Sequence, residues 1–356
     1  MPSSIFQARL AQSAGSITRV QGIEAGHFTD TRRPTGCSVV IARAGAVGGV
    51  DVRGAAPGTR ETDLLHPTNL VERVHAVMLC GGSAWGLEAA GGAVRWLEEQ
   101  GVGLDVGYAR LPLVPAAVLF DLGVGDARIR PDAAAGHAAC AAASRDAPAE
   151  GNVGAGAGAS VGKVFGMEHA MKGGIGTASV TLDGVTVGAL VACNALGDVL
   201  DPDTGALLAG ARTADGLRLR DTRRALLRGE LPQPVLAGTN TTIGVIATDA
   251  QISKAQAHRL AVVSHDGLAR AINPVHTMSD GDTLFTLGTG ASGRTLGMMV
   301  LAAMAAEVTA VATVRAVLCA RGINTSDGLW LPSASDFEDR PSILRQDALR
   351  QAQDER

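Results

Sequence analysis

The chain has 356 residues, of which 46% are hydrophobic and 19% charged, so it has the composition of a globular protein and not of a disordered one. Its net charge of -4 and its 3% of aromatic residues give no electrostatic footprint for binding nucleic acid. The 46 glycines follow no G-X-Y period, which excludes collagen and predicts many tight turns.

The N-terminal half alternates strands and helices. Residues 1–12 lack the basic-then-apolar order of a signal peptide. Apolar runs predict buried strands at 36–43, 74–80 and 115–123. Apolar spacing predicts a helix over 83–100, and a run rich in alanine predicts another over 132–146.

The C-terminal half continues this alternation. Two apolar runs flank Asp183-Gly184 and predict a hairpin over 176–194. Residues 211–234 read as a solvated connector with a short helix at 221–229. Further expectations are strands at 241–248 and 282–290, a helix from a capping box at Ser253 and Gln256 to Ala271, and a buried helix over 296–320. These elements predict helices layered on a mixed sheet.

Three features bear on domains and location. Residues 1–332 read as a single domain, and 333–356 as a polar, flexible tail outside the core. Glu307 and Arg315 interrupt the apolar stretch 296–320, which therefore reads as a core helix and not as a membrane span. Five cysteines without a C-x-x-C pair predict buried, reduced thiols and a cytoplasmic protein: Cys37, Cys80, Cys140, Cys193 and Cys319.

Two glycine-rich stretches invite functional interpretations. "GNVGAGAGASVGKVFG" ends like a phosphate-binding loop, but Ala157 and Val164 stand where that motif needs glycine and a hydroxyl. A glycine-lined loop that leads to a half-buried Lys163 fits better. "CGGSAWG" resembles a nucleophile elbow, but Trp85 replaces its last glycine, so Ser83 reads first as a helix cap. The eight histidines show no metal-binding spacing, and we expect no metal.

The segment "GTNTT" (238–242) raises two hypotheses. The plain one is a strand that begins with threonines, which are common in strands. The other is self-cleavage: Thr241 attacks the carbonyl of Asn240, the resulting ester is hydrolysed, and Thr241 becomes a chain terminus whose amine serves as the base. Asp280 and Asp282 in "SDGDT" are likewise either a turn or a pair of carboxylates that orients an amine.

Four motifs, in this order, decide between these readings: "GAGASVGKVFG", "GALVACNALGDVLDPDTG", "GTNTTIGVIATDA" and "PVHTMSDGDTLF". Together they resemble the L-aminopeptidase/D-esterase family of self-processing peptidases (S58-type), whose relatives include β-aminopeptidases and nylon-oligomer hydrolases. The resemblance runs from "SITRVQGIEAGH" to about residue 320. It implies an α/β (α+β) fold, a four-layer αββα sandwich similar to the N-terminal-nucleophile hydrolases.

The resemblance also implies which residues form the active site. The chain is expected to cut itself between Asn240 and Thr241 into an α chain 1–240 and a β chain 241–356, with Thr241 as nucleophile. Asn194 matches the asparagine whose side-chain N–H stabilises the oxyanion, and Lys163 matches a lysine near the nucleophile. Asp280 and Asp282 match residues that position the nucleophile's amine.

The pocket and the partners follow from the same resemblance. Trp85 stands where the family often has tyrosine, a second oxyanion donor, so the pocket formed with Ser83 is expected to differ. Expected substrates are short peptides, amino-acid amides or 6-aminohexanoate oligomers. No cofactor is expected. A homo-oligomer, a tetramer of αβ units, is expected, with no partnership to nucleic acid or membrane.

Two alternatives stay open: an acyltransferase to an amine acceptor, as in ornithine acetyltransferases, and a non-catalytic homologue that stays uncut. Whether an added amine outcompetes water separates the first from a hydrolase. An intact chain with wild-type Thr241 would indicate the second.

Overall fold

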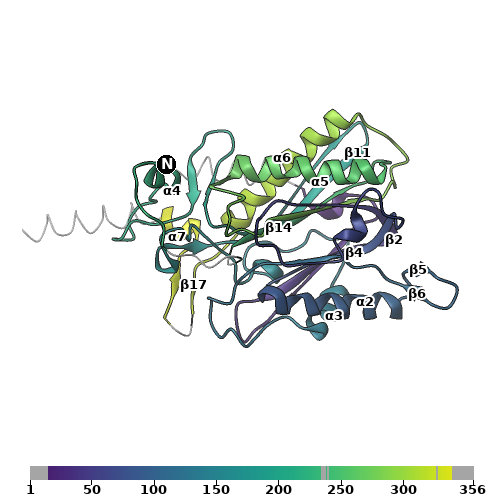
Figure 1. Ribbon diagram of the computed structural model, residues 1–356, viewed down its shortest axis with the longest axis horizontal. Helices are drawn as coiled ribbons and strands as arrows, with labels where there is room; N and C mark the ends of the chain where they lie inside the picture. Colours follow the sequence, from purple (N-terminus) through teal and green to yellow (C-terminus); the bar gives the residue numbers. More distant parts are fainter. Residues whose placement is uncertain (1–14, 234–237, 239, 326–327, 339–356) are drawn as a thin grey trace, which may run out of the picture.

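Two helix pairs enclose the strands from opposite sides in the computed structural model, which describes residues 15–233, 238, 240–325 and 328–338 (Figure 1). One pair is α2 (Ala89–Glu99) and α3 (Ala133–Ala141). The other pair is α5 (Lys254–Ala271) and α6 (Met298–Leu318). The strands between them form two stacked layers.

The layer beside α5 and α6 contains the strands that carry the predicted site. Its order is β10 (Gly174–Leu182), β11 (Val185–Asn194), β14 (Thr241–Thr248), β16 (Thr283–Gly288) and the second half of β2 (Gly36–Val52). Neighbours run antiparallel except β14 and β16, which are parallel. The parallel pair places the start of β14 beside the turn that precedes β16.

The layer beside α2 and α3 contains β1 (Glu24–Thr29), the first half of β2, β4 (Arg73–Cys80), β7 (Ala116–Val118) and β3 (Thr59–Arg60). The long strand β2 belongs to both layers, because its first half pairs with β1 and its second half with β16. Its register against β4 shifts between Ile41 and Ala46. Hydrogen bonds therefore connect both layers into one nine-stranded sheet.

Three apolar clusters fill the spaces between four layers. On β11, Val187 and Val191 face the α5–α6 cluster, whereas Leu190 faces the cluster between the sheets. On β4, Leu79 faces that middle cluster and Met78 the α2–α3 cluster. This alternation is the period of two that a strand imposes on its side chains. The four-layer αββα sandwich predicted from the sequence is confirmed.

Short elements complete the fold. They are β5 (Leu104–Asp105), β6 (Arg110–Leu111), β8 (Ser160–Val161), β9 (Met171–Lys172), β12 (Asp198–Leu200), β13 (Leu207–Ala209), β15 (Ile272–Asn273), β17 (Ile323–Asn324), β18 (Trp330–Leu331), α4 (Thr222–Leu227), α7 (Ala334–Glu338) and the 3₁₀ turns η1 (Ile17–Arg19), η2 (Asp63–Leu65), η3 (Ser83–Glu88), η4 (Gly154–Gly156) and η5 (Met167–His169).

Most of the predicted elements are present. Asp183-Gly184 turns the β10–β11 hairpin, and the capping box of Ser253 and Gln256 starts α5, which ends at Ala271. Three elements are clearly shorter than predicted, among them the helix over 132–146, which spans only Ala133–Ala141. Only 116–118 of the strand at 115–123 pairs, and the helix over 83–100 begins with the 3₁₀ turn η3. A Cβ on Gly86 would lie 1.9 Å from the carbonyl oxygen of Gly81, so this turn packs tightly on the end of β4.

Helix α6 is long and apolar enough to cross a membrane by length and composition. It lies instead in the core, since 61% of its apolar window is buried and residues such as Leu301 and Val317 belong to the α5–α6 cluster. The five cysteines are free thiols, of which only Cys319 is partly exposed. Burial raises the pKa of Cys80 and the other thiols, which makes them inert.

The expected boundary of the peripheral tail at residue 333 is wrong by a few residues. Ser333 and Ala334 are buried, and Ala334 packs in the α5–α6 cluster. The apolar side chain of Ala334 and the hydrogen bonds that Asp336 makes with Ser333 bring this segment back onto the core. Residues 339–356 lie outside the described part of the chain, as do 1–14 and residues 234–237 and 239 before Thr241.

Candidate active site

The predicted site residues come together from three neighbouring elements. Thr241 is the first residue of β14, and Asn194 is the last residue of β11, directly opposite it in the antiparallel register. An isolated bridge joins Asn240 to Asp280, in the turn that leads into β16. The strand order of the sheet thus assembles residues that are up to 88 positions apart in the sequence (194 to 282).

Thr241 is buried, and its hydroxyl donates a hydrogen bond to the carbonyl oxygen of Asn240. The same carbonyl oxygen accepts the N–H of Gly281 at 2.9 Å. Only glycine allows so close an approach, since a Cβ at this position would lie 2.7 Å from the carbonyl oxygen of Ala56 and 3.0 Å from the Thr241 hydroxyl oxygen. The bond between Asn240 and Thr241 is therefore held rigidly beside a backbone donor.

The two carboxylates flank this glycine and have different partners. Asp282 accepts the N–H of Thr242 at 2.6 Å through Oδ1 and Nδ1–H of His276 at 2.8 Å through Oδ2. Asp280 accepts the N–H of Thr277 at 2.8 Å. Burial, followed by the charge of Asp282, raises the pKa of Asp280. The segment is a turn, as one hypothesis had it, and its carboxylates also lie against the start of β14, as the other required.

Asn194 and Lys163 form a second polar group. The Asn194 Oδ1 accepts the N–H of Ser160 at 3.0 Å and the Lys163 ammonium at 2.9 Å, and its Nδ2 donates to the carbonyl oxygen of Phe120 at 3.0 Å. Two donors at Oδ1 fix the orientation of the amide. Among the described residues only the Phe120 carbonyl accepts from Nδ2, so one Nδ2 hydrogen is uncommitted there. Burial lowers the pKa of Lys163 to about 7, although Asp280 opposes this shift.

A cavity of about 200 Å³ opens on Thr241. It is lined by Ala56, Pro57, Gly58, Ser83, Ala84, Val118, Leu119, Phe120, Gly238 and Thr241. Ser83 is thus part of its wall, but it does not cap a helix, because η3 begins at Ser83 itself and has no side-chain cap. Trp85 does not line the cavity. Its side chain is 58% exposed, and the Arg130 guanidinium lies 4.2 Å from its ring centre.

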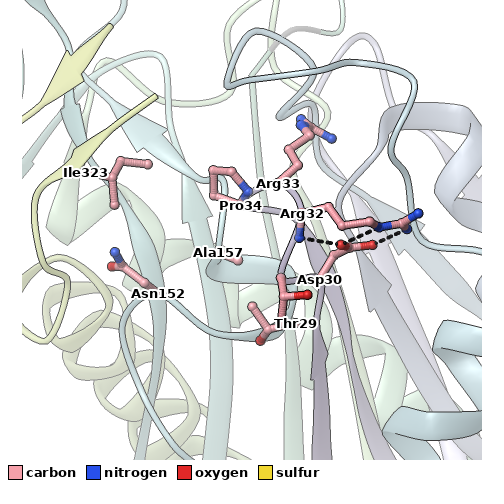
Figure 2. A pocket seen from close by; sticks show the side chains of 9 residues that line it. Thr29, Asp30, Arg32, Arg33, Pro34, Asn152, Ala157 and Ile323 are labelled. Carbon is pink, nitrogen blue, oxygen red and sulfur yellow. Dashed lines mark hydrogen bonds and ion pairs between the residues drawn. The ribbon is translucent and has the colours of Figure 1, made fainter. Parts of the chain in front are cut away.

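A second hollow, of about 270 Å³, lies away from these residues. It is lined by Thr29, Asp30, Thr31, Arg32, Arg33, Pro34, Asn152, Ala157 and Ile323 (Figure 2). Arg32 folds back onto Asp30 at 2.6 Å, and the Arg33 guanidinium is buried in an ion pair with Asp121. Each of these arginines is therefore paired, Arg32 with Asp30 in the lining and Arg33 with Asp121 outside it, and none of the predicted site residues lines the hollow.

The described residues contain no group of three or more His, Cys, Asp or Glu side chains placed to hold a metal ion. The glycine-rich loop before Lys163 does not open an α-helix, as a phosphate-binding loop does; it contains η4 and β8 and is followed by η5. The alternative interpretation was a glycine-lined loop that leads to a half-buried lysine. The loop does lead to Lys163, but this side chain is buried and not half-buried.

Three contributors to the site were not singled out from the sequence. The Gly281 N–H and the Phe120 carbonyl are backbone groups, whose positions carry no residue signature. His276 bonds Asp282 from a left-handed backbone conformation with φ +56°, and only its place in "PVHTMSDGDTLF" pointed to it.

The comparisons with known proteins agree with this geometry. The family model of peptidase family S58 matches residues 15–330. An uncharacterised aminopeptidase of Mycobacterium tuberculosis is 47% identical over 326 residues, which cover 86% of this chain and 92% of the relative. A 6-aminohexanoate-oligomer endohydrolase of Paenarthrobacter ureafaciens is 34% identical over 271 residues, with 75% and 72% coverage.

Solved structures show the same fold at lower identity. A β-aminopeptidase of Burkholderia sp. has a TM-score of 0.64 at 22% identity, covering 91% of this chain and 92% of its own. The L-aminopeptidase D-Ala-esterase/amidase of Ochrobactrum anthropi, described as a variant of the Ntn hydrolase fold, has a TM-score of 0.67 at 20% identity, with 94% coverage of both chains. The chain therefore belongs to peptidase family S58 and is an amide-bond hydrolase with an Ntn-hydrolase-like fold.

Proposed function

We propose that this chain is a self-processing amide hydrolase whose nucleophile is the N-terminal threonine created by cleavage before Thr241. One observation carries the proposal: the Thr241 hydroxyl lies against the carbonyl of Asn240, and the N–H of Gly281 already binds the oxygen of that carbonyl. A nucleophile and an oxyanion donor thus meet at a single peptide bond. A plain strand start needs neither.

In the self-cleavage step, the Thr241 Oγ attacks the carbonyl carbon of Asn240. The charge that develops on the carbonyl oxygen is stabilised by the Gly281 N–H, the kind of donor that is worth about 2.7–4 kcal/mol of barrier. The C–N bond then breaks, the nitrogen of Thr241 takes up a proton, and Asn240 is left as an ester on the threonine oxygen. Water hydrolyses this ester to the Asn240 carboxylate and a free Thr241.

In turnover, the new α-amine of Thr241 acts as base for its own hydroxyl, since such an amine has a pKa of about 8. The oxygen attacks the substrate amide, the amine product leaves with a proton, and water hydrolyses the acyl-enzyme. The uncommitted Nδ2 hydrogen of Asn194 serves as oxyanion donor. Lys163 orients that amide, and its lowered pKa of about 7 lets it exchange a proton near neutral pH.

Short, uncharged acyl groups fit the cavity. Apart from Ser83 and Thr241, its described lining consists of small or apolar residues, and its volume of about 200 Å³ suits a group of a few carbons. The relatives carry names of aminopeptidases and of hydrolases for 6-aminohexanoate oligomers. Short peptides, amino-acid amides and such oligomers are therefore the proposed substrates.

Mass spectrometry of the purified protein tests the proposal. We expect the wild type to yield fragments 1–240 and 241–356, Thr241→Ser to yield the same fragments, and Thr241→Val to stay whole and inactive. Thr242→Val is the matched control, the same change one residue along the strand, and we expect it to be cut. A Thr241→Val chain that is cut at this bond would contradict the assignment of the nucleophile.

A further inference from the structure

Among the described residues, His276 is the side chain that donates to the carboxylate of Asp282. Its ring Nδ1 lies 2.8 Å from Oδ2 of Asp282, and its backbone nitrogen lies 3.2 Å from the same oxygen. Because Asp282 already accepts the N–H of Thr242, it acts as acceptor at both of its oxygens. A hydrogen of the imidazole therefore lies on Nδ1, the nitrogen that faces the carboxylate.

Most of the contact is shielded from solvent, and the carboxylate is the more buried partner. The side chain of Asp282 is 1% exposed and that of His276 is 19% exposed. The ring of His265 packs edge-on against His276, with the ring centres 4.9 Å apart. The Nε2 of His265 faces the carbonyl oxygen of Asp51 at 3.1 Å, and burial lowers the pKa of His265 to about 4.

The position of the carboxylate matters for the nucleophile. Asp282 Oδ1 holds the N–H of Thr242, the first peptide of β14 after Thr241, at 2.6 Å. An aspartate can rotate about its side-chain bonds, and a donor at the second oxygen removes that freedom. The hydrogen bond from His276 therefore holds Asp282 in place, and Asp282 in turn holds the start of β14.

We propose that His276 is a positioning residue for the Thr241 nucleophile, acting through the carboxylate of Asp282. The inference rests on the proposed function of Thr241 and adds to it a residue outside the cavity. His276 does not line the cavity, so its loss lowers the rate of the chemical steps and leaves substrate binding unchanged.

The left-handed backbone of His276 allows a sharp test. Asparagine tolerates φ +56°, and its Nδ2 stands where Nδ1 of histidine stands; glycine tolerates the same backbone and has no donor. We expect His276→Asn to cut itself and to keep kcat within about fivefold. For His276→Gly we expect kcat to fall about 10- to 100-fold with KM within twofold, and self-cleavage to slow by a similar factor, as for a lost hydrogen bond to a charged group.

The controls separate the possible failures. His258→Asn removes a histidine whose Nδ1 contacts the Val50 carbonyl instead, and we expect wild-type rates. Thermal denaturation of each variant shows whether it folds. A folded His276→Gly with wild-type kcat overturns the proposal, and so does an Asn variant that is as slow as the Gly variant. If the wild type is never cut at Thr241, the proposed function itself is wrong. That result is distinguishable from a failure of the proposal for His276.

Discussion

Two of the three buried lysines, Lys163 and Lys172, lie nine positions apart in the sequence, and their surroundings differ. Lys172 is completely buried in β9, and its ammonium donates to the carbonyl oxygens of Gly156, Ala159 and Gly173 at 2.8–2.9 Å. Lys163 is also buried, but its ammonium donates to two oxygens of a single residue, the backbone and side-chain oxygens of Asn194. Burial lowers the pKa of both lysines to about 7.

The difference shows that burial and a lowered pKa do not identify a functional lysine. Three carbonyls use all three hydrogens of the Lys172 ammonium, so it holds the glycine-rich loop together and has none left to donate. Lys163 lies next to a side chain that faces Thr241 in the strand register, and its ammonium keeps one hydrogen uncommitted among the described contacts. The partners, not the burial, assign a structural role to the first and a role at the site to the second.

The largest effect should follow from Lys172→Met, which keeps the length of the side chain and removes the ammonium donor from three buried carbonyl oxygens. Those of Gly156 and Ala159 each keep one backbone N–H donor. We expect the free energy of unfolding to fall by about 3–5 kcal/mol. Urea denaturation at pH 7 measures this change. Lys254→Met is the matched control: Lys254 donates to only two carbonyl oxygens, those of Leu64 and Asn69, and should cost less. A loss below about 1 kcal/mol for Lys172→Met would contradict its structural role.

The sequence predicted some residues of this region and missed others, and the lysines show why. The local pattern left Thr241 open as a plain strand start and Asp280 and Asp282 as a plain turn. The four ordered motifs that contain these residues and Asn194 could be matched to a family, and that resemblance singled them out. Lys172 was not singled out, because its partners are carbonyl oxygens, which every residue has.

The same limit applies to the fold. The capping box and the Asp-Gly turn are local signals, and both elements end where the sequence predicted. The sharing of β2 between two layers depends on which distant strands pair with it. Local sequence does not encode such pairing.

The pH dependence of stability gives the second test. In the folded chain the pKa of Lys163 is about 7, and in the unfolded chain it is near 10.5. Between these values the unfolded chain binds a proton that the folded chain has released, so the free energy of unfolding rises with pH, by at most about 1.4 kcal/mol per unit and per lysine. Lys163→Met and Lys172→Met should each flatten this rise, and only the second should also lower the whole curve.

Urea denaturation from pH 7 to 10 gives the slopes. A Lys163→Met curve parallel to that of the wild type would mean that Lys163 keeps its proton throughout this range. In that case its role would be to hold Asn194 as a cation, and not to exchange protons.

The smallest effect should come from Ser160→Ala, at the link between the two lysines. Lys172 holds the carbonyl oxygen of Ala159, and the N–H of the next residue, Ser160, donates to Asn194 Oδ1 at 3.0 Å. The Ser160 hydroxyl makes only a weak contact, at 4.0 Å, with the sulfur of Met167. Alanine keeps the N–H, so we expect turnover within about twofold and stability within about 0.5 kcal/mol of the wild type. A tenfold loss of turnover would show that the hydroxyl, and not the backbone held by Lys172, orients Asn194.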